Sequence, residues 1–87
     1  MKDAIYGAID VVEIGRRIRL ARTAAQLSQE EFARYVNTSV SNLWKWENGT
    51  SITFSNIIKV SDATGVPLDY FAGRTNVLEL PEIKGAK

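Results

Sequence analysis

The sequence predicts an all-α protein, with five helices over residues 12–73, an N-terminal arm at residues 1–11 and a tail at residues 74–87. Three observations favour this fold class. Apolar residues recur every three or four positions, capping residues stand before the apolar segments, and glycine or asparagine follows most of them. A chain of 87 residues is long enough for one such domain with a modest core.

The first expected helix lies within EIGRRIRLARTAAQL, residues 13–27. Its apolar face follows steps of three and four residues: Ile14, Ile18, Ala21 and Ala25. Four arginines are spread around the helix and cannot share one face: Arg16, Arg17, Arg19 and Arg22. We expect most of these arginines to lie in solvent, with Arg22 as the exception.

A second, short helix is expected over QEEFARYV, residues 29–36. Ser28 precedes it and Glu31 follows three residues later, which is the capping-box pattern of a helix start. Its expected core residues are Phe32, Ala33 and Val36.

A third helix follows closely, over VSNLWKWEN, residues 40–48. Asn37 tolerates the left-handed conformation of a tight turn, Ser39 can cap the new helix, and Gly49 can end it. Only three or four residues join the second and third helices, a spacing typical of helix-turn-helix units.

Two more helices complete the domain. TFSNIIKVSDATG, residues 53–65, offers Thr53 as a cap, Gly65 as a stop, and the apolar residues Phe54, Ile57, Ile58 and Val60. PLDYFAG, residues 67–73, has Pro67 in its first turn and ends at Gly73. The arm forms either a loose segment or an extra helical turn, and NVLELPEI in the tail forms a short strand or an extended segment.

Composition excludes several kinds of site. The chain has no cysteine and no histidine, so we expect no disulfide, no metal site, no cofactor and no His-based catalytic group. Glu30 and Glu31 are paired carboxylates, but capping and helix-dipole effects explain them, and we expect no enzyme activity and no catalytic residue. Without a signal peptide or a long apolar span, we expect a cytoplasmic protein that does not enter a membrane.

Two tryptophans stand two residues apart in the third helix and must point in different directions. At about 100° per residue, Trp46 falls on the side of Leu43 and Glu47, whereas Trp44 falls on the side of Ser41 and Lys45. We therefore expect Trp46 in the core and Trp44 on the surface. An exposed indole beside hydroxyls and a lysine suits a surface that reads a DNA groove, since apolar rings contact thymine methyl groups. The alternative for Trp44 is a protein contact or packing onto its own domain.

Three segments resemble the repressor/Cro (XRE) type of helix-turn-helix family: IGRRIRLAR, LSQEEFARYVNTSVSNLWKWENG and IIKVSDATGVPLDYF, in the family's order and at its spacing. The resemblance covers most of the chain. It implies a repressor-like five-helix DNA-binding domain, in which Ala33 is the small residue where two helices cross and Glu47, Asn48 and Gly49 form the typical end of the third helix.

The resemblance also implies site residues. The expected base contacts lie on the third helix: Val40, Ser41, Trp44 and Lys45. The expected phosphate contacts are Gln29, Ser39 and Asn48, with a plain exposed side chain as the alternative for Gln29. Arg22 and Glu47 match a structural pair that joins the first helix to the end of the third.

From these features we expect a sequence-specific regulator of transcription that binds double-stranded DNA, and specifically a repressor. A single reading helix contacts few base pairs, so we expect a homodimer on a palindromic operator. The alternative is a DNA-binding antitoxin that also neutralises a protein toxin. Net charge alone, at +1, does not indicate the partner.

The expected dimer surface is the apolar part of the chain that the helix-turn-helix leaves unused. It comprises Leu68, Tyr70 and Phe71 of the fifth helix and residues 74–83 of the tail. Val77 and Leu78 point to opposite sides of an extended segment, so one can cover its own domain while the other meets a partner.

Overall fold

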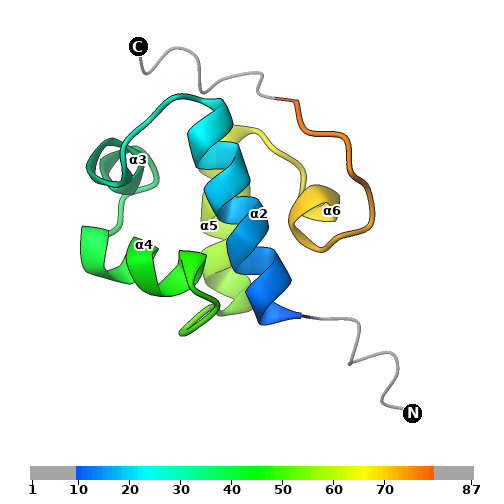
Figure 1. Ribbon diagram of the computed structural model, residues 1–87, viewed down its shortest axis with the longest axis horizontal. Coiled ribbons are helices and arrows are strands. Elements are labelled where there is room, and N and C mark those ends of the chain that lie inside the picture. Colours follow the sequence, from blue (N-terminus) through cyan, green and yellow to red (C-terminus); the bar gives the residue numbers. More distant parts are fainter. Residues whose placement is uncertain (1–9, 80–87) are drawn as a thin grey trace.

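The computed structural model describes residues 10–79. This part of the chain forms five helices and no strand: α2 (Val11–Ala24), α3 (Gln29–Tyr35), α4 (Val40–Glu47), α5 (Phe54–Thr64) and α6 (Leu68–Phe71) (Figure 1). The all-α prediction is confirmed. Most of the expected arm, at residues 1–9, and the end of the expected tail, at residues 80–87, lie outside the described residues.

The predicted helix caps are present: Ser28, Ser39 and Thr53. At α3 the capping box is complete, because Ser28 Oγ accepts from the backbone N–H of Glu31 at 3.0 Å and the Glu31 carboxylate accepts from the Ser28 N–H at 2.8 Å. A further cap was not predicted. Asp10 accepts from the backbone N–H of Val12 at 3.0 Å, so α2 begins at Val11, inside the predicted arm.

Helix ends follow the predicted turn residues with small shifts. Helix α5 stops at Gly65, whose φ of 76° is left-handed, as predicted. Pro67 is the residue before α6 rather than part of its first turn, so this helix starts one residue later than predicted. Helix α2 ends at Ala24, three residues before the end of its apolar segment.

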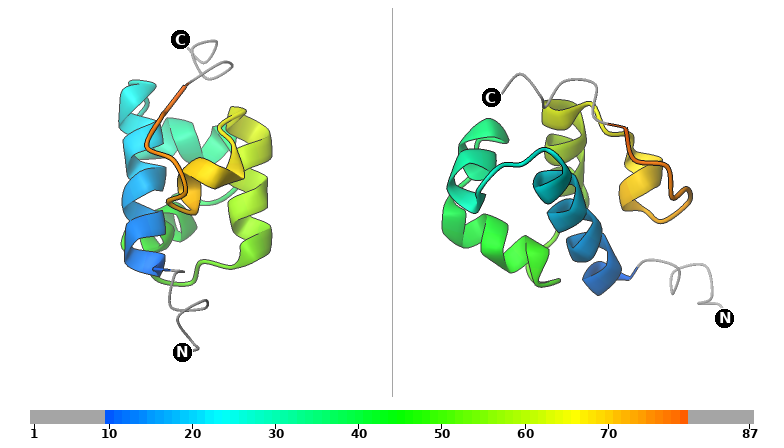
Figure 2. Two further views of the ribbon diagram at one scale, coloured as in Figure 1. Left: turned by 90° about the vertical axis from the view of Figure 1, so that its right-hand side faces the viewer. Right: turned by 45° about the horizontal axis from the view of Figure 1, so that its top comes forward.

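Helix α2 lies in the middle of the domain, with α3 and α4 on one side and α6 and the segment after it on the other (Figures 1 and 2). The predicted apolar faces of α2 and α3 are buried: Ile14, Ile18, Ala21, Ala25, Phe32, Ala33 and Val36. Leu43 and Trp46 of α4 join the same core, together with Val60, Val66 and Phe71. One continuous core therefore holds α4 in place from behind.

Helices α2 and α4 cross closely at Gly15. A Cβ atom added there would overlap the Trp46 carbonyl oxygen and come within 2.9 Å of the Glu47 carbonyl oxygen. Backbone atoms cannot move aside as the end of a flexible side chain can, so only glycine fits at this crossing. The position of α4 against α2 is thus set by backbone contact as well as by apolar packing.

The prediction that Tyr70 and Phe71 belong to a free apolar surface was wrong. Their exposed fractions are 3% and 0%, because the short helix α6 packs its rings inward against α2 and α5. The two rings meet edge to face, with centroids 5.6 Å apart. Leu68, the first residue of the same helix, stays partly exposed.

The prediction that Arg17 lies in solvent was also wrong. Its guanidinium is buried and donates to the carbonyl oxygens of Tyr70 at 2.9 Å and Thr75 at 2.7 Å, and to Asn76 Oδ1 at 2.6 Å. It also lies over the Tyr70 ring, 4.8 Å from the centroid. Arg17 therefore fastens the segment after α6 to α2.

Residues 74–79 form no helix or strand, and they cover the side of α2 next to α6 (Figure 2). Leu78 packs against the core, whereas Val77 is 62% exposed. The two side chains thus face opposite ways, as the extended pattern predicts. Leu78 covers its own domain, and Val77 remains available for contact with another molecule.

Candidate nucleic-acid interface

The turn between α3 and α4 is held by backbone bonds and by α5. Asn37 has a φ of 62°, the predicted left-handed conformation, and the Thr38 N–H donates to the Ala33 carbonyl oxygen at 2.8 Å. Lys59 Nζ of α5 donates to the Asn37 carbonyl oxygen at 3.2 Å. These bonds fix the angle at which α4 leaves the turn, so α3 and α4 form a rigid helix-turn-helix pair.

Helix α4 has one buried side and one exposed side. Leu43 and Trp46 are 0% and 3% exposed, whereas Trp44 is 55% exposed. The prediction that the two tryptophans occupy different environments is therefore confirmed. The other predicted base-reading side chains are also exposed: Val40, Ser41 and Lys45.

The exposed side of α4 is suited to a polyanion. The one carboxylate of the helix, Glu47, is buried, so the accessible face carries Lys45 and no acidic side chain. Lysine can donate to a guanine edge or to a phosphate, hydroxyls can donate or accept, and the Trp44 indole offers an apolar ring. This combination can contact bases and the sugar-phosphate backbone together.

The three predicted phosphate contacts lie at the ends of the two helices. Ser39 is exposed before α4, and its hydroxyl accepts from the Asn42 N–H at 3.0 Å while keeping a proton that it can donate. Asn48 is exposed after α4, and its Nδ2 donates to the Trp44 carbonyl oxygen at 2.8 Å. Gln29 is half-buried at the start of α3.

Glu47 is the polar centre of this region. Its carboxylate is 1% exposed and accepts from Arg22, with Nε at 2.6 Å from Oε2 and Nη2 at 3.2 Å from Oε1. The Arg22–Glu47 pair expected from the resemblance is therefore present. Gln29 Nε2 donates to Oε1 of the same carboxylate at 3.0 Å, and Arg19 Nε lies 3.9 Å from it. The cluster joins α2, α3 and the end of α4.

A family model described as helix-turn-helix matches residues 18–71, more than half of the chain. The chain belongs to this family. The match confirms the resemblance to the repressor/Cro (XRE) type that the sequence segments carry, and it makes residues 18–71 a DNA-binding domain of the transcription-regulator class.

Named relatives share this helix-turn-helix domain. An uncharacterized transcriptional regulator in the ATPase CF(0) region of Rhodospirillum rubrum is 39% identical over 59 residues, covering 67% of this chain and 55% of the relative. An uncharacterized HTH-type transcriptional regulator of Sinorhizobium medicae is 31% identical over 61 residues, covering 69% and 44%. The chain thus spans about half the length of the curated relatives it matches.

A solved structure supports the same fold. The restriction-modification controller protein C.AhdI from Aeromonas hydrophila superposes with a TM-score of 0.65 and is 32% identical. The match covers 71% of this chain and 96% of that protein. The arrangement of α3 and α4 against α2 is therefore that of a helix-turn-helix regulator.

Two polar contacts of the helix-turn-helix domain were missed by sequence reasoning. Arg19 donates to the Glu47 carbonyl oxygen at 3.2 Å, although the sequence placed it among the arginines that lie in solvent or, as a weaker alternative, approach the DNA backbone from the flank. The bond from Gln29 to Glu47 joins residues 18 positions apart on different helices. No periodic pattern reports such a pair, and only the crossing of the helices brings these groups together.

Residues 10–79 contain no group of three acidic, cysteine or histidine side chains that could hold a metal ion. No helix among these described residues is long and apolar enough to cross a membrane.

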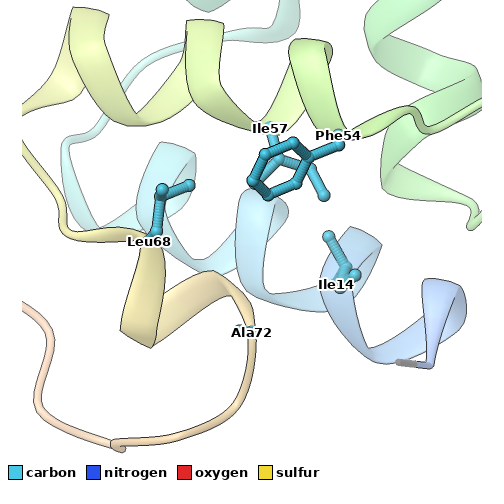
Figure 3. Close-up of a pocket in the computed structure, with 5 residues that line it drawn as sticks. All are labelled: Ile14, Phe54, Ile57, Leu68 and Ala72. Carbon is cyan, nitrogen blue, oxygen red and sulfur yellow. The ribbon is translucent and has the colours of Figure 1, made fainter. Parts of the chain in front are cut away.

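An apolar pocket lies away from α3 and α4, between α2, α5 and α6 (Figure 3). It has a volume of about 90 Å³ and is lined by Ile14, Phe54, Ile57, Leu68 and Ala72. Phe54 sits at its rim and is 69% exposed, so the first residue of α5 contributes little to the core that its apolar segment suggested. A ring this exposed beside an apolar pocket is typical of a protein contact surface.

Proposed function

We propose that this chain is a sequence-specific, double-stranded DNA-binding regulator of transcription that acts as a repressor. The observation that carries the proposal is the two-sided construction of α4: Trp46 and Leu43 fix the helix in the core, and Trp44 and Lys45 stand exposed on its outer side. A helix held rigidly from behind can enter a major groove without reorganising. Occupying promoter DNA is sufficient for repression, whereas activation needs a further contact.

The contacts divide into two kinds. The exposed side chains of α4 choose the bases: Val40, Ser41, Trp44 and Lys45. Side chains at the helix ends position the domain on phosphates: Gln29, Ser39 and Asn48. The position of the second group at both ends of the α3–α4 pair supports this division, because phosphate strands flank a groove on both sides.

The proposal includes a homodimer on a palindromic operator, in the cytoplasm. The apolar pocket and the exposed Phe54, Leu68 and Val77 supply a surface separate from α3 and α4, so a second copy can pack there while both copies face DNA. Tyr70 and Phe71 are buried and do not belong to this surface. The two protomers then occupy half-sites about one helical turn of DNA apart, and binding of one protomer strengthens binding of the other.

Selection of bound sequences from a random DNA pool tests the reading surface. We expect an enriched palindrome for the wild-type chain. Lys45→Ala should change the selected motif, whereas Gln29→Ala should weaken binding to all sequences alike. If Lys45→Ala leaves the motif intact and only lowers the salt slope by about 1, Lys45 is a phosphate contact. Selection of no motif by the wild-type chain would contradict the proposed function.

The dimer surface can be tested without disturbing the core. Phe54→Ser removes an exposed ring and should shift the chain towards monomer in sedimentation, with a larger loss of affinity for a full palindrome than for a half-site. Asp62→Ser, at an exposed position on the same helix, is the matched control. An unchanged oligomeric state in Phe54→Ser would place the contact elsewhere.

A further inference from the structure

The side chain of Gln29 is held by a buried carboxylate. Its Nε2 lies 3.0 Å from Glu47 Oε1, and the same carboxylate accepts from Arg22 Nε at 2.6 Å. Glu47 is 1% exposed, so it belongs to the interior, whereas Gln29 is half-buried and reaches the surface. The contact thus links a fixed interior group to a surface amide.

This contact dictates which way the Gln29 amide faces. An ionised carboxylate only accepts hydrogen bonds, so the amide must turn its NH₂ group, not its carbonyl oxygen, towards Glu47. One N–H is used by Glu47, and the planar NH₂ group keeps a second N–H that points elsewhere. Without an acceptor-only partner, the amide could flip and exchange this donor for an oxygen.

The side chains that surround the Glu47 carboxylate carry a net positive charge. One carboxylate, Glu47, is accompanied by two guanidiniums, since Arg22 pairs with it closely and Arg19 Nε lies 3.9 Å away. The cluster therefore has a net charge of +1 at neutral pH. A positive cluster beside a fixed N–H donor favours an anionic acceptor.

We propose that Glu47 is a positioning residue for DNA binding: it fixes the Gln29 amide so that its second N–H is presented to a backbone phosphate. This inference rests on the proposed function. The Glu47 carboxylate then has two roles. Its pair with Arg22 holds α4 against α2, and its bond from Gln29 sets the direction of a phosphate contact on α3.

A double-mutant cycle on the full chain tests the inference, with affinity measured on the selected DNA. Gln29→Ala should weaken binding about tenfold per half-site, the value of one charge-assisted hydrogen bond. Glu47→Gln keeps the shape but offers a donor as well as an acceptor, and should weaken binding about threefold. In the Gln29→Ala background, Glu47→Gln should cause a smaller loss than in the wild-type background, since the part of its effect that runs through Gln29 is then absent.

Charge alone predicts the opposite sign, which makes the cycle decisive. Removing a negative charge near DNA strengthens binding, and Glu30→Gln, an exposed carboxylate on the next residue of α3, measures that effect. If Glu47→Gln strengthens binding as Glu30→Gln does, or weakens it equally in both backgrounds, the inference is overturned. If Gln29→Ala binds the selected motif as tightly as the wild-type chain does, the inference is overturned. The proposed function still holds in that case, because the wild-type chain binds a specific motif.

The wild-type chain provides a test that does not depend on the folding of Glu47→Gln. The side-chain amide of Gln29, assigned by its absence in Gln29→Ala, should show one slowly exchanging proton in NMR spectra without DNA. On adding DNA, the other proton should shift more than the first. If both side-chain amide protons of Gln29 exchange with water equally fast in the free chain, the fixed orientation is contradicted.

Discussion

Two carboxylates of this domain, Glu47 and Glu13, each meet two arginines but occupy different surroundings. The Glu47 side chain is 1% exposed and its close partner Arg22 lies 25 residues away in the sequence. The Glu13 side chain is 33% exposed, and its partners Arg16 and Arg17 lie three and four residues further along the same helix. The first group joins three helices, and the second lies along one helix.

The difference shows that the same chemical pair contributes according to what it joins and how deeply it is buried. A buried charge depends on its partner, because removing one side leaves the other without solvation. An exposed pair on one helix exchanges its partner for water at little cost. Arg17 belongs to both cases, since its buried guanidinium donates to the exposed Glu13 carboxylate and also to the segment after α6.

The largest expected effect is that of Glu47→Ala. It removes the carboxylate that accepts from Arg22 Nε, Arg22 Nη2 and Gln29 Nε2, and leaves Arg22 only the Leu27 carbonyl oxygen as an acceptor. We expect a loss of roughly 3 to 5 kcal/mol in the free energy of unfolding. Glu13→Ala, the matched change at the exposed carboxylate, should cost much less, because Arg16 lies in solvent and Arg17 keeps its bonds to the segment after α6. Urea midpoints of the two variants measure the comparison directly. Equal losses would mean that burial does not separate the two groups.

An intermediate effect is expected for Arg17→Met, which keeps the apolar stem and removes the guanidinium. The Thr75 carbonyl oxygen then loses its donor, whereas the Tyr70 carbonyl oxygen keeps the Gly73 N–H at 3.1 Å, and one unsatisfied acceptor costs roughly 1 to 3 kcal/mol. Arg16→Met is the control, because Arg16 bonds only Glu13 among the described residues. Faster hydrogen exchange in residues 75–78 of Arg17→Met, but not of Arg16→Met, should accompany the loss.

The comparison also explains which features the sequence can predict. The caps at Ser28, Ser39 and Thr53, and the separation of Trp44 from Trp46, depend on residues within one or two helical turns, so local rules suffice. The Arg22–Glu47 pair is non-local, and it was expected because the whole motif resembles a known family.

Other contacts had no such guide. The sequence predicted a solvent-exposed side chain for Arg17 as for Arg16, because helical periodicity does not show which other segment of the chain covers a helix. The covering segment, residues 74–79, has no regular structure and therefore no period. Gly15 and the Gln29–Glu47 bond also depend on how two helices cross, and single-sequence patterns do not report a crossing.

The smallest expected effect is a pH dependence that arises from Glu13. Hydrogen bonds from Arg16, and next from Arg17, lower the pKa of the Glu13 carboxyl from its usual 4.5 to about 2. The unfolded chain therefore binds a proton at this carboxyl before the folded domain does. The stabilisation from Glu13 is complete above pH 4.5 and is lost as the pH falls from there through about 2.

Glu13→Gln cannot titrate at this position, so its stability should fall less steeply than that of the wild-type chain between pH 4.5 and about 2. Above pH 5, where the carboxylate is ionised in both states, the two proteins should differ by a constant amount. Urea midpoints collected across this range measure both quantities. Parallel pH profiles for the wild-type chain and Glu13→Gln would show that the bonds from Arg16 and Arg17 do not persist in solution. Glu13 would then be an ordinary surface carboxylate, and its contrast with Glu47 would be larger still.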